Sequence, residues 1–257
     1  MRIHLIQLFE ETVSRFPEKT AVIDKDRSIS FSDLRQKAVQ TAATIALKGI
    51  PQNRPIGVFL DKSIESVYAD LGILYAGDFY MNLDIKTPAE RIKNILQLTE
   101  PAAIISTSIQ IKSIAAVIPD SVKLILLDEL DTEMAIDGQM LSNRRATVID
   151  TDPSCIINTS GSTGTPKGVV LNHKSFFDFL DWAIETFRFG NDLVMGSLSP
   201  IVFDIYSFEL CMLMAKASTL VVLPAHLAAF PAKILEVLEK HQVNFLFWVP
   251  TIMVNIA

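Results

Sequence analysis

Short apolar runs recur along the chain. They fall at residues 57–60, 102–106, 122–127, 154–158, 194–199, 219–223 and 244–249. None shows the strict alternation of a half-exposed strand, and unbroken apolar runs are typical of strands buried on both faces of a parallel sheet. We therefore predict an α/β fold with mostly parallel strands and helices on both faces of the sheet structure. In such folds ligands bind beyond the carboxyl ends of the strands.

Amphipathic segments between these runs predict helices. Residues 32–48, 63–76 and 231–240 each carry apolar side chains at helical spacing. Gly49 follows the first of them, where a helix C-cap is expected. At Thr87-Pro88-Ala89-Glu90, the threonine is predicted to cap a further helix and the glutamate to close a capping box.

Polar segments predict turns and connections. Residues 21–23 and 29–31 are expected to form a hairpin around the polar turn at residues 24–27. Residues 128–150 show no clear periodicity and are interpreted as a connection. After Val249 the chain ends within eight residues, and no closing helix is predicted. We interpret this end as that of a truncated fragment, with a natural short chain whose end packs inward as the alternative.

Composition and charge exclude several classes of protein. The chain has 257 residues, 49% of them hydrophobic, which is enough for one large domain or two small ones. Its net charge of −6 is scattered and gives no basic surface for nucleic acid or for an anionic membrane. No apolar run approaches the roughly 18 residues of a membrane-spanning helix, and no signal peptide is recognisable. The two cysteines lie in apolar runs, and we expect a cytoplasmic protein.

The segment at residues 159–169 carries the clearest chemistry, and it reads TSGSTGTPKGV. It follows a predicted strand, and a second short strand is expected at residues 169–171. Its glycines allow the backbone to turn sharply and approach a ligand. Its N–H groups, hydroxyl groups and Lys167 are all donors, so an anion such as a phosphate is the expected ligand. The spacing is not that of a Walker A loop, because Pro166 precedes the lysine and Gly168 follows it.

This segment resembles the phosphate-binding signature of the adenylate-forming enzymes, which include acyl-CoA synthetases, luciferases and the adenylation domains of nonribosomal peptide synthetases. Residues 29–34 (ISFSDL) are similar to the "LTYxEL" motif of that family. Residues 74–84 (LYAGDFYMNLD) are similar to "LKAGxAYVPID", and Phe203-Asp204 begins a segment similar to "FDxS". The resemblance extends over nearly the whole chain.

The resemblance implies a fold of two interleaved, mostly parallel sheets flanked by helices, here the N-terminal core of that fold in truncated form. It places residues 52–190 in one α/β subdomain, and residues 1–51 with 191–257 in a second, incomplete one. The small C-terminal domain that carries a catalytic lysine would lie beyond Ala257. We therefore expect residues 1–257 alone to be inactive. Apolar surface exposed by the truncation would favour a homodimer.

The resemblance also implies the reaction and its cofactors. ATP and a carboxylate would give an acyl adenylate and pyrophosphate, with Mg²⁺ as the cofactor. The acyl group would then pass to a thiol, either the phosphopantetheine of a carrier protein or CoA. Lys167 and Thr163 are assigned as catalytic residues, and no protein ligand to a metal is assigned. The expected nucleotide-binding residues are Thr159, Ser160, Gly161, Ser162, Thr163, Gly164, Thr165, Lys167 and Gly168.

Asp204 indicates which acid is activated. It lies in an apolar segment, where a lone carboxylate is costly to bury unless it is paired. By resemblance it would hold the α-ammonium group of an amino acid, and Ile205, Phe208 and Phe247 would contact a small or hydrophobic side chain. The alternative is that Asp204 only caps a helix that begins near Ile205.

Several interpretations of the sequence stay open. An acyl-CoA or aryl-acid ligase is the first alternative to an amino-acid-activating enzyme, and a non-catalytic nucleotide-binding fragment is the second. His173 is interpreted either as a substrate contact or as the first residue of a helix. Trp182 and Phe187, with other apolar residues at helical spacing, are expected to belong to the core, and Trp248 is expected to be packed.

Overall fold

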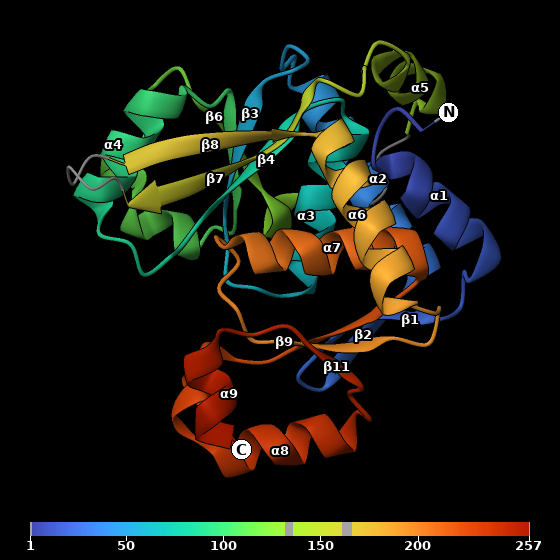
Figure 1. Ribbon diagram of the computed structural model, residues 1–257. Coiled ribbons are helices and arrows are strands. Elements are labelled where there is room, and N and C mark those ends of the chain that lie inside the picture. Colours follow the sequence, from blue (N-terminus) through green and yellow to red (C-terminus); the bar gives the residue numbers. More distant parts are fainter. Residues whose placement is uncertain (1, 132–135, 161–165, 257) are drawn as a thin grey trace.

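The computed structural model describes residues 2–131, 136–160 and 166–256, and Figure 1 shows two β-sheets with helices around and between them. The first sheet contains, in spatial order, β6 (Lys123–Leu126), β5 (Ala103–Ser106), β3 (Pro55–Phe59), β4 (Phe79–Leu83), β7 (Pro153–Ser160) and β8 (Pro166–Asn172). The second contains β11 (Phe245–Leu246), β9 (Val194–Ser197), β10 (Thr219–Val222), β1 (Thr20–Asp24) and β2 (Arg27–Ser30).

Most neighbouring strands in these sheets are parallel. The antiparallel pairs are the hairpins β1–β2 and β7–β8. The two mostly parallel sheets with flanking helices confirm the predicted fold class. The first sheet draws its strands from residues 55–172 alone, whereas the second combines residues 20–30 with residues 194–246. Subdomain boundaries at residues 51/52 and 190/191 stay a prediction.

The helices begin and end at residues whose chemistry favours it. Ser30 caps α2 by accepting a hydrogen bond from the Asp33 N–H, and Gly49, just beyond its end, has φ +66°. Ser63 and Ser66 form a capping box at α3. The helices described are α1 (Ile6–Arg15), α2 (Phe31–Leu47), α3 (Ile64–Tyr75), α4 (Ala89–Thr99), α5 (Gly138–Ala146), α6 (His173–Phe187), α7 (Asp204–Lys216), α8 (Pro231–Lys240) and α9 (Pro250–Ile256), with 3₁₀ turns at Gln110–Ser113, Ala115–Val117, Leu127–Glu129 and Ala225–Ala229.

Helix α7 occupies the centre of the molecule, between the two sheets (Figure 1). All of its residues from 205 to 214 are buried, so it has no polar face turned to water. It packs against β9 and β10 of the five-stranded sheet and against helices α1 and α6. The hydroxyl of Thr12 on α1 donates a 2.7 Å hydrogen bond to the Met214 carbonyl near the end of α7.

Buried polar contacts join α7 to the six-stranded sheet and its helix α3. The Tyr206 hydroxyl donates to the Asp70 carboxylate at 2.8 Å, and the Asn82 amide donates to the same oxygen at 3.2 Å. The Tyr80 hydroxyl donates to Ser207 at 3.3 Å. Burial raises the pKa of Asp70 to about 7, against the opposing effect of its two hydrogen bonds. The carboxyl group is therefore more easily kept neutral in the folded protein than in the unfolded chain.

Two predicted strands differ from the structure. β6 is an edge strand in which Lys123 is exposed and Leu124 is 38% exposed, so burial on both faces was wrong for it. The predicted strand at residues 244–249 is only the two-residue β11. Residues 247–249 follow β11 without strand pairing, and Pro250, whose fixed φ suits the first turn of a helix, begins α9. A helix therefore follows the last strand, contrary to prediction.

The predicted capping box at Thr87–Glu90 is wrong. Helix α4 begins at Ala89 with Pro88 in the N-cap position and no side-chain cap. Thr87 lies one position too early, in a turn where its N–H donates to the Asp84 carbonyl at 2.9 Å. The segment at residues 128–150 is not only a connection, because Asp137 caps α5 within it. Helix α1 had no counterpart among the predicted elements.

The raised pKa of Asp70 predicts a pH-dependent stability. Between its ordinary value of 3.8 and about 7, the folded state holds a proton that the unfolded chain releases, so the contribution of this group to stability falls as pH rises through that range. Asp70→Asn should remove this slope. Urea unfolding should show the variant gaining more than about 1 kcal/mol over the wild type between pH 4 and pH 8. The exposed Asp26→Asn is the control, and parallel pH profiles for Asp70→Asn and wild type would contradict the assignment.

Candidate functional site

The predicted phosphate-binding segment lies at the tip of the β7–β8 hairpin. Thr159 pairs with Lys167 and Asn158 with Gly168 across the hairpin, and the Thr159 hydroxyl donates to the Lys167 carbonyl at 3.4 Å. The two strands thus bring both ends of the segment together. Gly161, Ser162, Thr163, Gly164 and Thr165 lie outside the described residues.

The described end of this hairpin has features that suit an anionic ligand. Lys167 is exposed, so its ammonium group is available. A Cβ atom on Gly168 would lie 3.1 Å from a methyl group of Ile156, so this face of the hairpin has little room for a side chain. The side-chain oxygen and nitrogen of Asn158 are buried and have no partner among the described residues. Buried polar atoms without partners are costly, which favours a polar ligand or loop contact beside them.

Asp204 is exposed, which corrects the expectation that this carboxylate is buried. Helix α7 begins at Asp204, and burial starts only at the next residue, Ile205. Phe203 is the N-cap, so Asp204 does not cap the helix either, although its Oδ1 accepts a 2.9 Å hydrogen bond from the Ile205 N–H. A carboxylate in the first turn of a helix is stabilised by the helix dipole. The second carboxylate oxygen accepts no hydrogen bond from the described residues, and Asp204 as a residue is exposed.

The other predicted substrate residues form part of an aromatic cluster. Phe208 is 5% exposed and Phe247 is 41% exposed, and their rings meet edge to face at 5.3 Å. Phe208 also packs on Phe179 of α6 and Phe245 of β11, at centroid distances of 5.6 and 6.2 Å. Sequence reasoning missed Phe179 and Phe245, because they come from distant segments that only the fold brings together.

The same cluster continues outward along α6. Trp182 stacks on Phe179 at 5.7 Å and meets Phe187 at 5.8 Å. Trp182 is 54% exposed and Phe187 is 57% exposed. The prediction that these two residues belong to the core is therefore wrong. Trp248 is packed as expected, and its indole N–H donates to the Gly196 carbonyl at 2.7 Å. A helical stripe gives the spacing of apolar residues but not the width of the face that is covered.

His173 is the first residue of α6 and is 3% exposed. Its Nδ1 accepts a hydrogen bond from the Leu5 N–H at 3.3 Å. Burial, with a smaller contribution from nearby His4, lowers the pKa of His173 to about 4. These contacts favour the helix-start interpretation over contact with a substrate.

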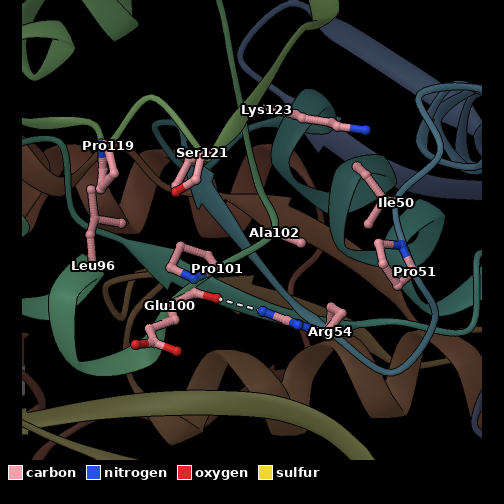
Figure 2. Close-up of a pocket in the computed structure, with 11 residues that line it drawn as sticks. Ile50, Pro51, Arg54, Leu96, Glu100, Pro101, Ala102, Pro119, Ser121 and Lys123 are labelled. Carbon is pink, nitrogen blue, oxygen red and sulfur yellow. Dashed lines mark hydrogen bonds between the residues drawn. The ribbon is translucent and has the colours of Figure 1, made fainter.

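Two cavities lie at opposite ends of the strands. One, of about 360 Å³, is lined by residues that follow the carboxyl ends of β1, β3, β4, β9 and β10, among them Lys62, which no sequence pattern had singled out. The other, of about 460 Å³, lies at the amino ends of β3, β5 and β6 (Figure 2). In Figure 2 the Arg54 guanidinium donates to the Glu100 carbonyl at this second cavity. Ligands of parallel sheets bind at the carboxyl ends, which favours the first cavity's side of the molecule.

The described residues meet neither the requirements of a metal site nor those of a membrane-spanning helix. Within it, no group of three or more His, Cys, Asp or Glu side chains could hold a metal ion. None of the helices in the described ranges is long and apolar enough to cross a bilayer.

The sequence of the chain matches a known protein family. The family described as AMP-binding enzyme matches residues 9–257. The chain belongs to the AMP-binding enzyme family. This membership confirms the resemblance inferred from the segment at residues 159–169 and from the motifs before and after it.

Curated relatives in this family include two peptide synthases. Tyrocidine synthase 1 of Brevibacillus parabrevis is 29% identical over 251 residues, which cover 98% of this chain and 23% of the relative. The dimodular nonribosomal peptide synthase of Bacillus subtilis is 30% identical over 252 residues, which cover 97% of this chain and 10% of the relative. The chain therefore spans less than a quarter of the length of these relatives.

Solved structures share the fold. The nonribosomal peptide synthetase FmoA3, in its form bound to α-methyl-L-serine-AMP, superposes with a TM-score of 0.86 at 22% identity, covering 99% of this chain and 28% of that one. VinN in complex with 3-methylaspartate superposes with a TM-score of 0.83 at 16% identity, covering 99% of this chain and 69% of that one. At these identities the likeness shows the fold of the chain.

The aromatic cluster predicts unequal costs for two similar substitutions. Phe208→Ala should lower the free energy of unfolding by about 3 kcal/mol or more, because it leaves a cavity among four rings. Phe247→Ala should cost less than about 1.5 kcal/mol, because its ring is already partly in water. Urea denaturation of both variants measures the difference, and equal losses would show that the rings are not arranged in this way.

Proposed function

We propose that the protein activates an amino acid by adenylation with ATP. The carboxylate oxygen of the amino acid attacks the α-phosphorus, the bond to the β-phosphate bridging oxygen breaks, and aminoacyl-AMP and pyrophosphate are formed. A carrier-protein phosphopantetheine thiol, or CoA, then takes the aminoacyl group and AMP leaves. The observation that carries the proposal is a donor-rich segment held by the β7–β8 hairpin in a chain of the AMP-binding enzyme family.

The hairpin has a defined role in this proposal. Negative charge grows on the leaving pyrophosphate during the reaction, and prepositioned donors stabilise such charge. Lys167, with Thr159 and Gly168 beside it, lies at the end of the hairpin, and in this proposal its ammonium group would contact phosphate oxygens. Thr163 joins Lys167 as a proposed catalytic residue, and the remaining proposed nucleotide contacts are Ser160, Gly161, Ser162, Gly164 and Thr165.

Mg²⁺ fits this site through the nucleotide rather than through a protein cage. The described residues group no three carboxylate, histidine or cysteine side chains, whereas Mg²⁺ commonly binds to substrate phosphates and retains several waters. When bound, it would neutralise phosphate charge. The lysine and the backbone donors of the hairpin would orient the same phosphates.

Asp204 selects an amino acid in this proposal. Its exposed carboxylate in the first turn of α7 would pair with the substrate's α-ammonium group. Closure of the site around the bound substrate would strengthen that pair. A fatty acid or aryl acid, the alternative substrates, would leave the carboxylate unpaired. Buried Ile205 and the Phe208–Phe247 ring pair would contact the side chain, which favours a small or apolar one.

Two further expectations concern residues 1–257 as an isolated chain. We propose that residues 1–257 bind the nucleotide but do not by themselves complete the activation. Self-association through exposed apolar residues also stays a proposal. Such residues include Phe247, Val249, Met253 and Val254 near the end of the described chain.

The role of Lys167 predicts a loss of nucleotide affinity. Lys167→Ala in residues 1–257 should weaken ATP binding in the presence of Mg²⁺ by about tenfold, the loss of one charge-assisted contact to phosphate. Isothermal titration calorimetry measures it. The control is Lys174→Ala, which removes an exposed lysine of α6 and should leave the affinity unchanged. An undiminished affinity in Lys167→Ala would argue against phosphate binding at the hairpin.

The role of Asp204 predicts a selective effect on the amino acid. In the full-length enzyme, Asp204→Ala should raise the KM for the activated amino acid by about tenfold or more, since the ammonium group loses its partner. The KM for ATP should stay near the wild-type value. Amino-acid-dependent pyrophosphate exchange measures both, with the exposed Asp178→Ala on α6 as the control. Intact amino-acid activation in Asp204→Ala would refute the ammonium pair.

A further inference from the structure

Lys62 bridges the two sheets. It follows β3 in the six-stranded sheet, and its ammonium group reaches the end of β9 in the other sheet. Its Nζ donates to the Ser197 carbonyl at 2.7 Å, the Ser197 hydroxyl at 2.8 Å and the Ser199 carbonyl at 2.7 Å. A lysine has three donors, and all three are used here. The ammonium group is therefore committed to this one contact rather than free for a ligand.

The contact continues into α7. The Ser197 hydroxyl, which accepts from Lys62, donates to the carboxylate of Glu209. Glu209 is 1% exposed and lies on α7, in the turn after the one that Asp204 begins. Burial lowers the pKa of Lys62 and raises the pKa of Glu209, and the opposite charge of each group works against the shift of the other. The ammonium group of Lys62, the hydroxyl group of Ser197 and the carboxylate of Glu209 thus form a connected hydrogen-bond network. Such a network holds the three side chains in one geometry.

The residues of this hydrogen-bond network lie on both sides of Asp204 in the sequence. Ser197 and Ser199 are held at the end of β9, and Glu209 is held within α7. Residues 198–203 between them form no helix or strand and deliver the backbone to the first turn of α7. The position of Asp204 therefore depends on how this short connection is anchored.

The proposed reaction requires Asp204 to be held in a fixed place relative to the bound nucleotide. The nucleotide-binding hairpin belongs to the six-stranded sheet, whereas Asp204 follows β9 of the five-stranded sheet. An in-line attack requires the reacting atoms to be held about 3 Å apart in a fixed orientation. A strong contact from the first sheet to the connection that carries Asp204 fixes the distance between the two binding groups.

We propose that Lys62 is a positioning residue for amino-acid recognition, because it holds residues 198–203 against the sheet that carries the nucleotide-binding hairpin. Lys62 touches neither substrate; it acts through the place that it gives to Asp204. The inference rests on the proposed function for its consequence in catalysis. The anchoring of residues 198–203 can be tested without any activity.

The first test measures the anchoring in residues 1–257 by hydrogen–deuterium exchange. Lys62→Met should speed exchange of the amides at residues 198–205 by about tenfold, while amides of β3 and β4 keep their wild-type rates. Ser197→Ala, which removes the hydroxyl link but leaves both carbonyls, should give a smaller effect at the same residues. Lys86→Met is the matched control, since this exposed lysine lines the same cavity and its ammonium group makes no hydrogen bond or ion pair with the described residues.

The second test measures the consequence in the full-length enzyme by pyrophosphate exchange. Lys62→Met should raise the KM for the amino acid by about tenfold, with the KM for ATP within about twofold of wild type. Lys62→Arg, which keeps the charge and several donors, should recover part of the loss. Lys86→Met should behave as wild type.

The outcomes separate this inference from the proposed function. Unchanged exchange at residues 198–205 in both Lys62→Met and Ser197→Ala would overturn the anchoring, and so would faster exchange spread evenly over the chain. Equal rises in both KM values would overturn the selective role. If Asp204→Ala had no effect while exchange at residues 198–205 rose in Lys62→Met, the ammonium pair would fail and the anchoring would stand.

Discussion

The structure depends on the burial of α7 between two sheets. An apolar helix with no polar face can exist in water only if neighbours cover it on all sides, and here β9, β10, α1 and α6 do so. Buried residues of the helix belong to the same apolar core cluster as residues of both sheets. The polar side chains that α7 carries inward, Tyr206, Ser207 and Glu209, each find a hydrogen-bond partner on another element. Burial supplies the driving force, and these contacts specify how the helix is oriented.

The same helix joins the architecture to the proposed chemistry. Its first residue, Asp204, is exposed, and residues 205–214 after it are buried. One helix thus offers a carboxylate at the surface and fixes its place through the core. The β7–β8 hairpin gives the proposed nucleotide-binding segment comparable support, because paired strands hold both of its ends. Binding groups on rigid elements can keep two substrates aligned, which is what adenylation demands.

Much of the fold could be predicted from local patterns. The hairpin β1–β2, helices α2, α3 and α8, and most buried strands were visible, because apolar periodicity and capping residues act over a few positions. The predictions were wrong where the burial of a strand depended on its position in the sheet, and where the first residue of a helix had to be identified. β6 has an apolar sequence but lies at an edge, and Thr87 resembles a cap but lies one residue too early. β11 ends at Leu246 and α9 starts at Pro250, and the apolar run through Val249 indicated neither boundary.

The sequence by itself determined the family and identified residues 159–169 as a candidate phosphate-binding segment. Glycines, hydroxyl residues and a lysine in a fixed order indicate anion binding without any information on the tertiary structure. It also selected Asp204, Ile205, Phe208 and Phe247, whose role as a group stays a prediction. The tertiary structure decided that Asp204 is exposed, that Phe179 and Phe245 join Phe208, and that Lys62 reaches across to Ser197 and Ser199. These contacts join residues far apart in the chain. No local pattern encodes them, since they exist only once two sheets have packed around one helix.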